Sequence, residues 1–286
     1  MRIALTGGSG RLGSVVARQL LASGHELLIL DRQPPTLESL AAMRFEQSDL
    51  NDADALRRVF AGFDALVHLA AIPNPIGHAP EAVFANNAVT SYNALLAAAD
   101  AGVRKVCMAS SINAIGGAFS RRARYDYLPV DEAHPSYNED AYSLSKWVGE
   151  AQADSIARLH ADMTISSLRF HGLTKRAERN DPELPDVPPE RRFRAVNHLW
   201  AYTDIDSAAI AVEKTLHAAF TGHQAFFIVA PRTIFSKDIA SRDLAAEHFS
   251  GTPIRGPLPA NAGFYDCSKA ERVLGWVHQD FTTNHG

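Results

Sequence analysis

The amino-acid sequence predicts an α/β fold, with a doubly wound parallel sheet and a small C-terminal lobe. Three features lead to this prediction. Short apolar runs alternate with longer segments of helical periodicity, a glycine-rich turn follows the first apolar run, and an aspartate ends the second. Strands that alternate with helices form βαβ units and a parallel sheet covered on both faces. Sheets of this kind bind ligands beyond the carboxyl ends of their strands.

The elements follow in order along the chain. The apolar runs predict strands at residues 2–6, 25–30, 65–70, 103–110 and 163–170, and the periodic segments between them predict helices at about 11–23, 52–61, 81–101 and 139–160. Segment 173–193 is charged, rich in proline and without periodicity, which predicts a long loop of the functional or mobile kind. Beyond it the pattern predicts a helix at about 204–219, a strand at 224–230, a helix at about 236–248 and a short helix from Ser268.

The composition narrows the class of protein. The 286 residues are 46% hydrophobic and 21% charged, as in ordinary globular chains, and the net charge of −4 offers no basic field for nucleic acid. We expect no membrane span and no signal peptide, since no apolar run is long enough. Cys107 and Cys267 sit in no CxxC motif, which predicts a cytoplasmic location. The 12 histidines show no metal-binding spacing, so no metal site is predicted.

The first predicted strand runs into "TGGSGRLG", residues 6–13, and an apolar helix follows. Glycine at this spacing permits the tight turn and lets the backbone approach a pyrophosphate, which the free N–H groups of the helix start then hold. The context predicts a Rossmann-type dinucleotide site that includes Gly7, Gly10, Arg11, Leu12 and Gly13. We expect a dinucleotide-binding domain over residues 1–171, to which segments of about 195–230 return, and a mainly substrate-binding lobe over residues 172–286.

Acidic residues at the ends of the next strands indicate the cofactor. Asp31 ends the second predicted strand, where a carboxylate can bind ribose hydroxyls. Its charge would repel a 2′-phosphate, so NAD is predicted, and the adjacent Arg32 leaves NADP open. Asp49 and Leu50 close the third strand, where Asp49 could meet the adenine amino group or cap the following helix.

A tyrosine and a lysine stand four residues apart in "AYSLSKWVGE", residues 141–150. On a helix, Tyr142 and Lys146 would share one face. A free tyrosine has a pKa near ~10, and a neighbouring ammonium favours its phenolate. Beside a nicotinamide, such a phenolate could remove an alcohol proton as hydride leaves. The alternative is that both are ordinary residues of a helix surface.

The sequence resembles the extended short-chain dehydrogenases/reductases of the NAD-dependent epimerase/dehydratase type. The resemblance covers most of the chain. It rests on TGxxGxxG (6–13), Asp31, "DL" (49–50), "HLAA" (68–71), "NNAVTSYNALLAAADAG" (86–102), "MASSINAIGG" (108–117), YxxxK (142–146), "SLRF" (167–170), "YTDIDSAA" (202–209) and "DCSKAERVLGW" (266–276).

The resemblance implies roles for matching residues. Ser111, with Ser110 as the alternative, would bind the reacting oxygen beside Tyr142. Asn87 would steady a proton-relay water near Lys146. The remaining positions that the family pattern places against the cofactor are Leu69, Ala70, Ala71 and Phe170. His171 follows them where the chain passes the nicotinamide and is assigned to the substrate.

Three reactions share this pattern: dehydrogenation, epimerisation and sugar dehydration. Dehydratases carry an acid pair after the catalytic hydroxyl residue, and here Ile112 and Asn113 stand there, which argues against dehydration. The nearest resemblance is to uronate dehydrogenases and related small-sugar enzymes. It implies that Asn113 and Arg194 bind the substrate, with Arg191 and Arg192 as rivals for its carboxylate.

The sequence therefore predicts an NAD-dependent oxidoreductase that acts on a small sugar, sugar acid or related hydroxy compound. Pro73 replaces a substrate-contacting serine of the uronate enzymes, which leaves other hydroxy compounds open. The alternatives are a nucleotide-sugar 4-epimerase that retains its NAD, and a non-catalytic NAD(P)-binding sensor. Reductases of bulky aromatic carbonyls are a further alternative, with Phe119, Tyr125 and Trp200 as pocket walls. The resemblance also implies a homodimer through the helices at about 81–101 and 139–160.

Overall fold

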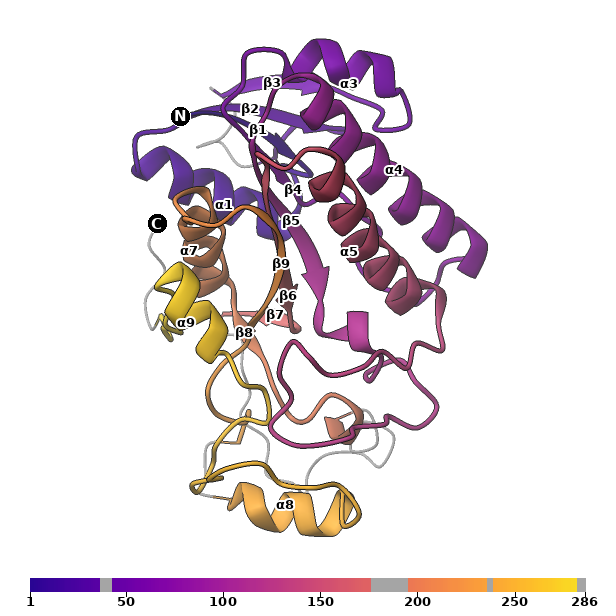
Figure 1. The fold of residues 1–286 in the computed structure, drawn as a ribbon, viewed down its shortest axis with the longest axis vertical. Helices are drawn as coiled ribbons and strands as arrows, with labels where there is room; N and C mark the ends of the chain where they lie inside the picture. Colours follow the sequence, from indigo (N-terminus) through magenta and orange to yellow (C-terminus); the bar gives the residue numbers. More distant parts are fainter. Residues whose placement is uncertain (37–42, 176–194, 236–238, 282–286) are drawn as a thin grey trace.

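The computed structural model describes residues 1–36, 43–175, 195–235 and 239–281 (Figure 1). A single sheet of seven parallel strands runs through the molecule in the order β3-β2-β1-β4-β5-β6-β9. The strands are β1 (Arg2–Thr6), β2 (Glu26–Asp31), β3 (Arg44–Gln47), β4 (Ala65–His68), β5 (Lys105–Ser111), β6 (Thr164–Phe170) and β9 (Gly222–Ile228). Two short strands, β7 (Leu173–Thr174) and β8 (Thr203–Asp204), pair with each other.

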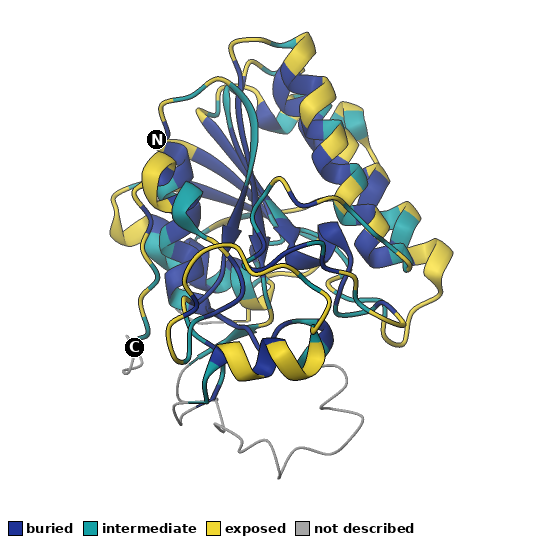
Figure 2. Cartoon of the chain, turned by 60° about the horizontal axis from the view of Figure 1, so that its bottom comes forward, coloured by how far each residue is buried: buried dark blue, intermediate teal, exposed yellow. Residues whose placement is uncertain are grey.

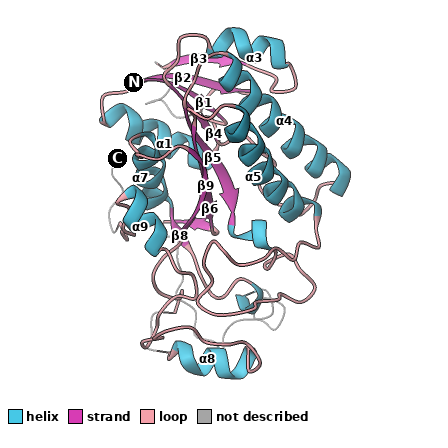
Figure 3. Ribbon diagram, viewed as in Figure 1, coloured by secondary structure: helices cyan, strands magenta, loops and turns pink. Residues whose placement is uncertain are grey.

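Helices cover both faces of the sheet (Figure 3). One layer holds α1 (Arg11–Ala22), α7 (Ile205–Leu216) and α9 (Ser268–Leu274), and the other holds α3 (Ala53–Phe60), α4 (Pro80–Asp100) and α5 (Ala141–Leu159). A one-turn 3₁₀ helix, η1 (Ile112–Ile115), follows β5, and α8 (Ser241–His248) lies beyond the carboxyl ends of the strands. None of the helices in the described ranges has the length and apolar character that a membrane crossing requires.

The side chains of the strands alternate between two apolar cores. In β1, Ile3 and Leu5 pack with α1 and α7, whereas Ala4 packs with α4 and α5. The five inner strands of the sheet are almost wholly buried, whereas the edge strand β3 and the outer faces of the helices are exposed (Figure 2). A third apolar cluster lies beyond the sheet and joins η1 to α8 through Trp200 and Phe264.

The order of the strands fixes where a ligand can bind. The chain winds outward from β1 to β2 and β3, then returns to β4 on the other side of β1. Between β1 and β4 the connections leave in opposite directions, and such a switch point opens a crevice at the carboxyl edge of the sheet. The residues that follow β1, β4, β5 and β6 all meet there.

Several element boundaries differ from the sequence prediction. Strand β4 ends at His68, not at residue 70, because the chain turns into the crevice after Leu69 donates its N–H to the Thr6 carbonyl. Helix α4 begins at Pro80, whose missing N–H is harmless in a first turn. The strand predicted at 224–230 is shifted to Gly222–Ile228, in register with β6. Part of the helix predicted at 236–248 lies outside the described residues, and α8 begins at Ser241.

Candidate active site

The crevice at the carboxyl edge of the sheet contains a cavity of about 680 Å³. A second cavity of about 330 Å³ adjoins it and shares four of its lining residues: Gly7, Gly10, Leu69 and Ala71. Of the predicted cofactor residues, the larger cavity also holds Arg11, Leu12, Gly13, Tyr142, Lys146 and Phe170, and the smaller one holds Asp31, Arg32, Asp49, Leu50 and Ala70. The two cavities form a continuous groove that suits an elongated ligand.

The glycine loop is shaped as a cradle. Gly7 has a φ of +72°, and a Cβ there would lie 2.6 Å from the backbone nitrogen of Ala70. A Cβ on Gly13 would lie 2.1 Å from the carbonyl oxygen of Gly7, so only glycine lets α1 start this close to β1. No side chain caps the start of α1 at Gly10, and the residues of its first turn line the cavity. Backbone N–H groups placed in this way fit a pyrophosphate.

Asp31 joins the loop to the second cavity. Its Oδ2 accepts a hydrogen bond from the backbone N–H of Ser9 at 3.0 Å, and its Oδ1 accepts one from the N–H of Arg32 at 2.7 Å. The carboxylate is thus fixed at the rim of the cavity, where ribose hydroxyls can donate to it. Asp49 does not cap the next helix, since that cap is Asp52, whose side chain accepts from the N–H of Ala55.

Tyr142 and Lys146 come from the first turns of α5. The Asp140 side chain caps this helix by accepting from the N–H of Ser143 at 2.9 Å, which fixes the start of the helix at the cavity wall. Lys146 donates from Nζ to the carbonyl of Ala109 at 2.8 Å, and its Nζ lies 5.7 Å from the centre of the Tyr142 ring. Ser111 lines the same cavity, where its hydroxyl acts to lower the pKa of the Tyr142 phenol. Three predicted catalytic side chains therefore meet in one cavity.

The structure separates the two serines that the sequence left as alternatives. Ser110 donates from Oγ to Oε1 of Glu150 at 2.5 Å, and that carboxylate is held by two hydrogen bonds from Arg169, at 2.9 and 2.7 Å. Ser110 is thus part of a buried ionic network. Ser111, one residue further along β5, faces the phenol.

Asn113 fixes the direction in which Ser111 can donate. Its Oδ1 accepts from the N–H of Ala118 at 3.0 Å, so its Nδ2 is turned to Ser111 and donates to Oγ at 3.2 Å. The backbone N–H of Asn113 donates to the same Oγ at 3.2 Å. With both lone pairs of Oγ occupied, the hydroxyl proton of Ser111 is left to donate toward Tyr142 or a substrate oxygen.

Burial dominates the acidity of the tyrosine and the lysine. It raises the pKa of Tyr142 to about 12, although the hydrogen bond from Ser111 acts to lower it. Burial also lowers the pKa of Lys146 to about 8, and it outweighs the carboxylate of Glu150, which acts to raise this pKa. In the protein without cofactor, desolvation disfavours the charged form of both groups. The expected lowering of the phenol pKa, which also needs the positive charge of an oxidised nicotinamide, stays a prediction.

Asn87 lies beside Lys146, but its amide is already engaged. Oδ1 accepts from the N–H of Ile72 at 2.8 Å, and Nδ2 donates to the carbonyl of Ile72 and to Oγ of Ser145. The side chain thus clamps the loop after β4 onto α5. Asn87 and Lys146 also line a cavity of about 10 Å³, which has room for one water.

The predicted substrate residues divide into two groups. Ser111, Asn113 and His171 line the larger cavity, and burial lowers the pKa of His171 well below its usual value. Arg194 and its rivals Arg191 and Arg192 lie outside the described residues. His198 also lines the cavity. Sequence reasoning missed it because only the fold brings its segment against β6.

Of the three aromatic residues considered as walls of a substrate pocket, one lines the cavity. Phe119 lines the cavity and packs edge-on against Tyr142, with ring centres 5.8 Å apart. Tyr125 and Trp200 belong to the third apolar cluster and do not line this cavity. A bulky aromatic pocket built from all three is therefore contradicted.

Known proteins resemble this chain in sequence. The NAD dependent epimerase/dehydratase family matches residues 3–182. A UDP-glucose 4-epimerase of Streptomyces lividans is 31% identical over 58% of this chain and 51% of its own length. An L-arabinose 1-dehydrogenase (NAD(P)(+)) of Haloferax volcanii is 32% identical over 59% of this chain and 66% of its own length. The chain thus spans about half to two thirds of these relatives.

Solved structures share the fold over almost the whole chain. MoeE5 in complex with UDP-glucuronic acid and NAD has a TM-score of 0.68 at 21% identity, covering 98% of this chain and 94% of its own. A mutated uronate dehydrogenase has a TM-score of 0.67 at 22% identity, covering 98% of this chain and 82% of its own. The glycine cradle and the fixed Asp31 fit the NAD that the matched family uses. From its sequence and its fold, the chain belongs to the NAD-dependent epimerase/dehydratase family.

Proposed function

We propose that this chain is an NAD-dependent dehydrogenase that oxidises a hydroxyl of a small sugar, sugar acid or related hydroxy compound, or reduces the corresponding carbonyl. The observation that carries the proposal is the meeting of Ser111, Tyr142 and Lys146 with the glycine loop in one cavity. The relative that acts on arabinose supports this substrate class. A sensor would have no use for this proton-transfer arrangement.

The proposed chemistry divides between the cofactor and the chain. Bound NAD supplies the hydride acceptor and a positive charge beside the phenol. Ser111 donates a hydrogen bond to the substrate oxygen and holds it against Tyr142. Tyr142 takes the hydroxyl proton as the carbon loses hydride, and the ammonium of Lys146 stabilises the phenolate. The alcohol becomes a carbonyl, and one proton leaves to solvent, with the water-sized cavity beside Lys146 and Asn87 as the proposed relay.

The cavity also bears on the competing reactions. Ile112 and Asn113 line it where a dehydratase needs carboxyl groups, so neither can expel water as an acid. A nucleotide-sugar 4-epimerase is the second candidate, because an epimerase is among the relatives and the groove is long. An epimerase would restore its NAD in each cycle and accumulate no NADH. We further propose that residues 1–171 form the dinucleotide-binding domain, to which segments of about 195–230 return, and that residues 172–286 otherwise form a mainly substrate-binding lobe.

The test is NADH formation from NAD with a panel of free aldoses, uronic acids and polyols, repeated with NADP and with UDP-sugars. Turnover of a small compound supports the dehydrogenase. Conversion of a UDP-sugar to its 4-epimer without net NADH would contradict it and favour the second candidate. Tyr142→Phe should lower turnover by roughly 10²- to 10⁴-fold and leave NADH affinity nearly unchanged.

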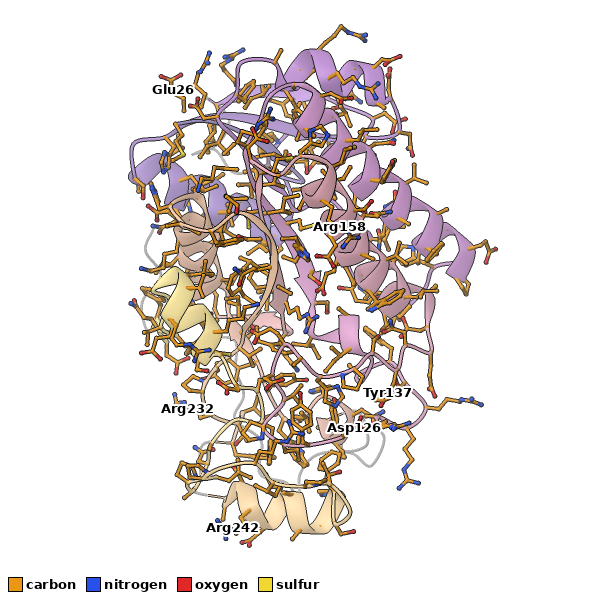
Figure 4. All side chains as sticks on the ribbon, in the orientation of Figure 1. Glu26, Asp126, Tyr137, Arg158, Arg232 and Arg242 are labelled. Atoms are coloured by element: carbon orange, nitrogen blue, oxygen red, sulfur yellow. The ribbon has the colours of Figure 1, made fainter. Side chains whose placement is uncertain are left out.

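A second tyrosine provides the matched control. Tyr137 donates from its hydroxyl to Asp126 at 2.7 Å and does not line the cavity (Figure 4). Tyr137→Phe should keep parental turnover. Equal losses in the two variants would show that the tyrosine at 142 is structural and would refute its role as a base.

We also propose a homodimer through α4 and α5. Four large apolar residues are exposed by 40% or more on these helices: Val89 and Tyr92 on α4, and Leu144 and Trp147 on α5. Figure 2 shows exposed segments along the outer side of both helices. Large apolar side chains that gather on one face commonly mark a protein interface. Trp147→Glu should shift the mass measured by light scattering from two chains to one. A parent chain that is monomeric would refute the proposal.

A further inference from the structure

Three side chains able to bind a metal ion meet on the protein, away from the crevice. His25 lies in the turn between α1 and β2, Glu213 lies on α7, and His217 ends that helix. One ligand atom from each lies within 4.8 Å of the other two. Because His25 precedes the amino end of β2, the group sits at the opposite edge of the sheet from the cavity. Figure 4 labels the neighbouring Glu26 there.

The helices explain why these residues come together. Glu213 and His217 are four residues apart, so they share a face in the last turn of α7. Helices α1 and α7 pack side by side in one layer (Figure 1). The turn that leaves α1 therefore passes beside the end of α7 and brings His25 to the pair.

Neighbouring groups support Glu213 and His25 as ligands. Gln19 donates from Nε2 to one carboxylate oxygen of Glu213 at 2.6 Å, which holds the carboxylate and leaves the other oxygen available. Metal-binding carboxylates usually have such a supporting hydrogen bond. The Nε2 atom of His25 is buried and has no hydrogen-bond partner among the described residues, and its Nδ1 lies 3.2 Å from the amine of Met1. Metal binding through Nε2 would place the ring proton on Nδ1, where it can donate to that amine in its uncharged form.

A metal ion would bind these side chains in their deprotonated forms. The positive charge of a bound ion would also offset the carboxylate of Glu213.

We propose that His25, Glu213 and His217 form a binding site for Zn²⁺. Two imidazoles and one carboxylate suit borderline transition-metal ions and not Mg²⁺ or Ca²⁺, which prefer oxygen ligands. Zinc accepts three protein ligands with water in the fourth position. Bond lengths of roughly 2.0–2.2 Å require small rotations of the three side chains. The ion would tie α1 to α7 and stabilise the folded chain without entering the crevice.

Thermal unfolding tests the proposal. The full chain, free of any tag and stripped with a chelator, is heated with and without Zn²⁺, and again with Mg²⁺. A ligand at a hundredfold excess over its Kd should raise Tm by about 5 °C. The rise should vanish in His217→Ala and in His25→Ala and should persist in His78→Ala, which removes an exposed histidine outside the group. Mg²⁺ should produce no rise.

Two results would overturn the proposal: no rise in Tm of the parent with Zn²⁺, or the same rise in His217→Ala. His217 is exposed, so its replacement leaves the fold intact even if His25→Ala does not fold. Titration with Co²⁺ gives a second measurement on folded protein. The parent should develop strong visible absorption from a four-coordinate ion, and His217→Ala should lose it. Neither measurement depends on the proposed dehydrogenase activity, so the two proposals fail separately.

Discussion

Replacing glycines of the loop one at a time should separate contacts within the protein from contacts with the cofactor. A Cβ on Gly13 would lie 2.1 Å from the carbonyl oxygen of Gly7, well inside any real contact. A Cβ on Gly10 would meet only that oxygen, at 3.2 Å, and its φ of −75° suits alanine. Gly13→Ala therefore strains the fold, whereas Gly10→Ala places a methyl group in the cradle.

The magnitudes follow from these contacts. Overpacking of a rigid site costs about 1–3 kcal/mol, so Gly13→Ala should lower Tm by roughly 2–5 °C and weaken NADH binding as well. Gly10→Ala should change Tm by less than about 2 °C, because the lower conformational freedom of alanine in the unfolded chain offsets the tight 3.2 Å contact. It should nevertheless weaken NADH binding at least about tenfold, equivalent to about 1.4 kcal/mol.

The assay is quenching of protein fluorescence by NADH, with Tm measured on the same samples. Gly251→Ala is the control, since a Cβ there meets nothing within 4 Å and its backbone is not strained. Parental NADH affinity in Gly10→Ala would show that the pyrophosphate does not approach this turn. Parental Tm in Gly13→Ala would refute the argument from close contacts.

Three further predictions follow from other residues. Asn113→Asp offers Ser111 a hydrogen-bond acceptor in place of a donor, so it should lower kcat roughly 10- to 100-fold at unchanged NADH affinity. If kcat falls less in Asn113→Asp than in Asn113→Ala, Asn113 does not donate to Ser111 as assigned. Burial lowers the pKa of His68 to about 3, so below pH 6.5 only the unfolded chain gains its proton. The contribution of His68 to the free energy of unfolding should then fall by about 2–3 kcal/mol between pH 6.5 and 4.5. Urea titrations that give His68→Gln the same pH dependence of unfolding free energy as the parent would refute this. Asp31→Ser removes the charge that faces a 2′-phosphate and should raise the ratio of NADPH to NADH affinity by roughly tenfold in fluorescence titrations, whereas an unchanged ratio would place the ribose elsewhere.

The sequence by itself determined the parts of the site that are local. Gly7, Gly10 and Gly13 lie in the loop after β1 and the first turn of α1, and Tyr142 and Lys146 lie one helical turn apart, so spacing alone brings each group together. The alternation of strands and helices likewise determined a parallel sheet, and the sheet determined where the ends of its strands meet.

Only the tertiary structure decided which neighbouring side chain acts. Ser110 and Ser111 look alike in sequence, but the fold packs Ser110 against the buried Glu150 and leaves Ser111, the last residue of β5, in the cavity with Tyr142. The raised pKa of the phenol arose in the same way, since burial depends on every element packed around α5. His25 and His217 meet only because α1 packs against α7, and no spacing along the chain records that contact.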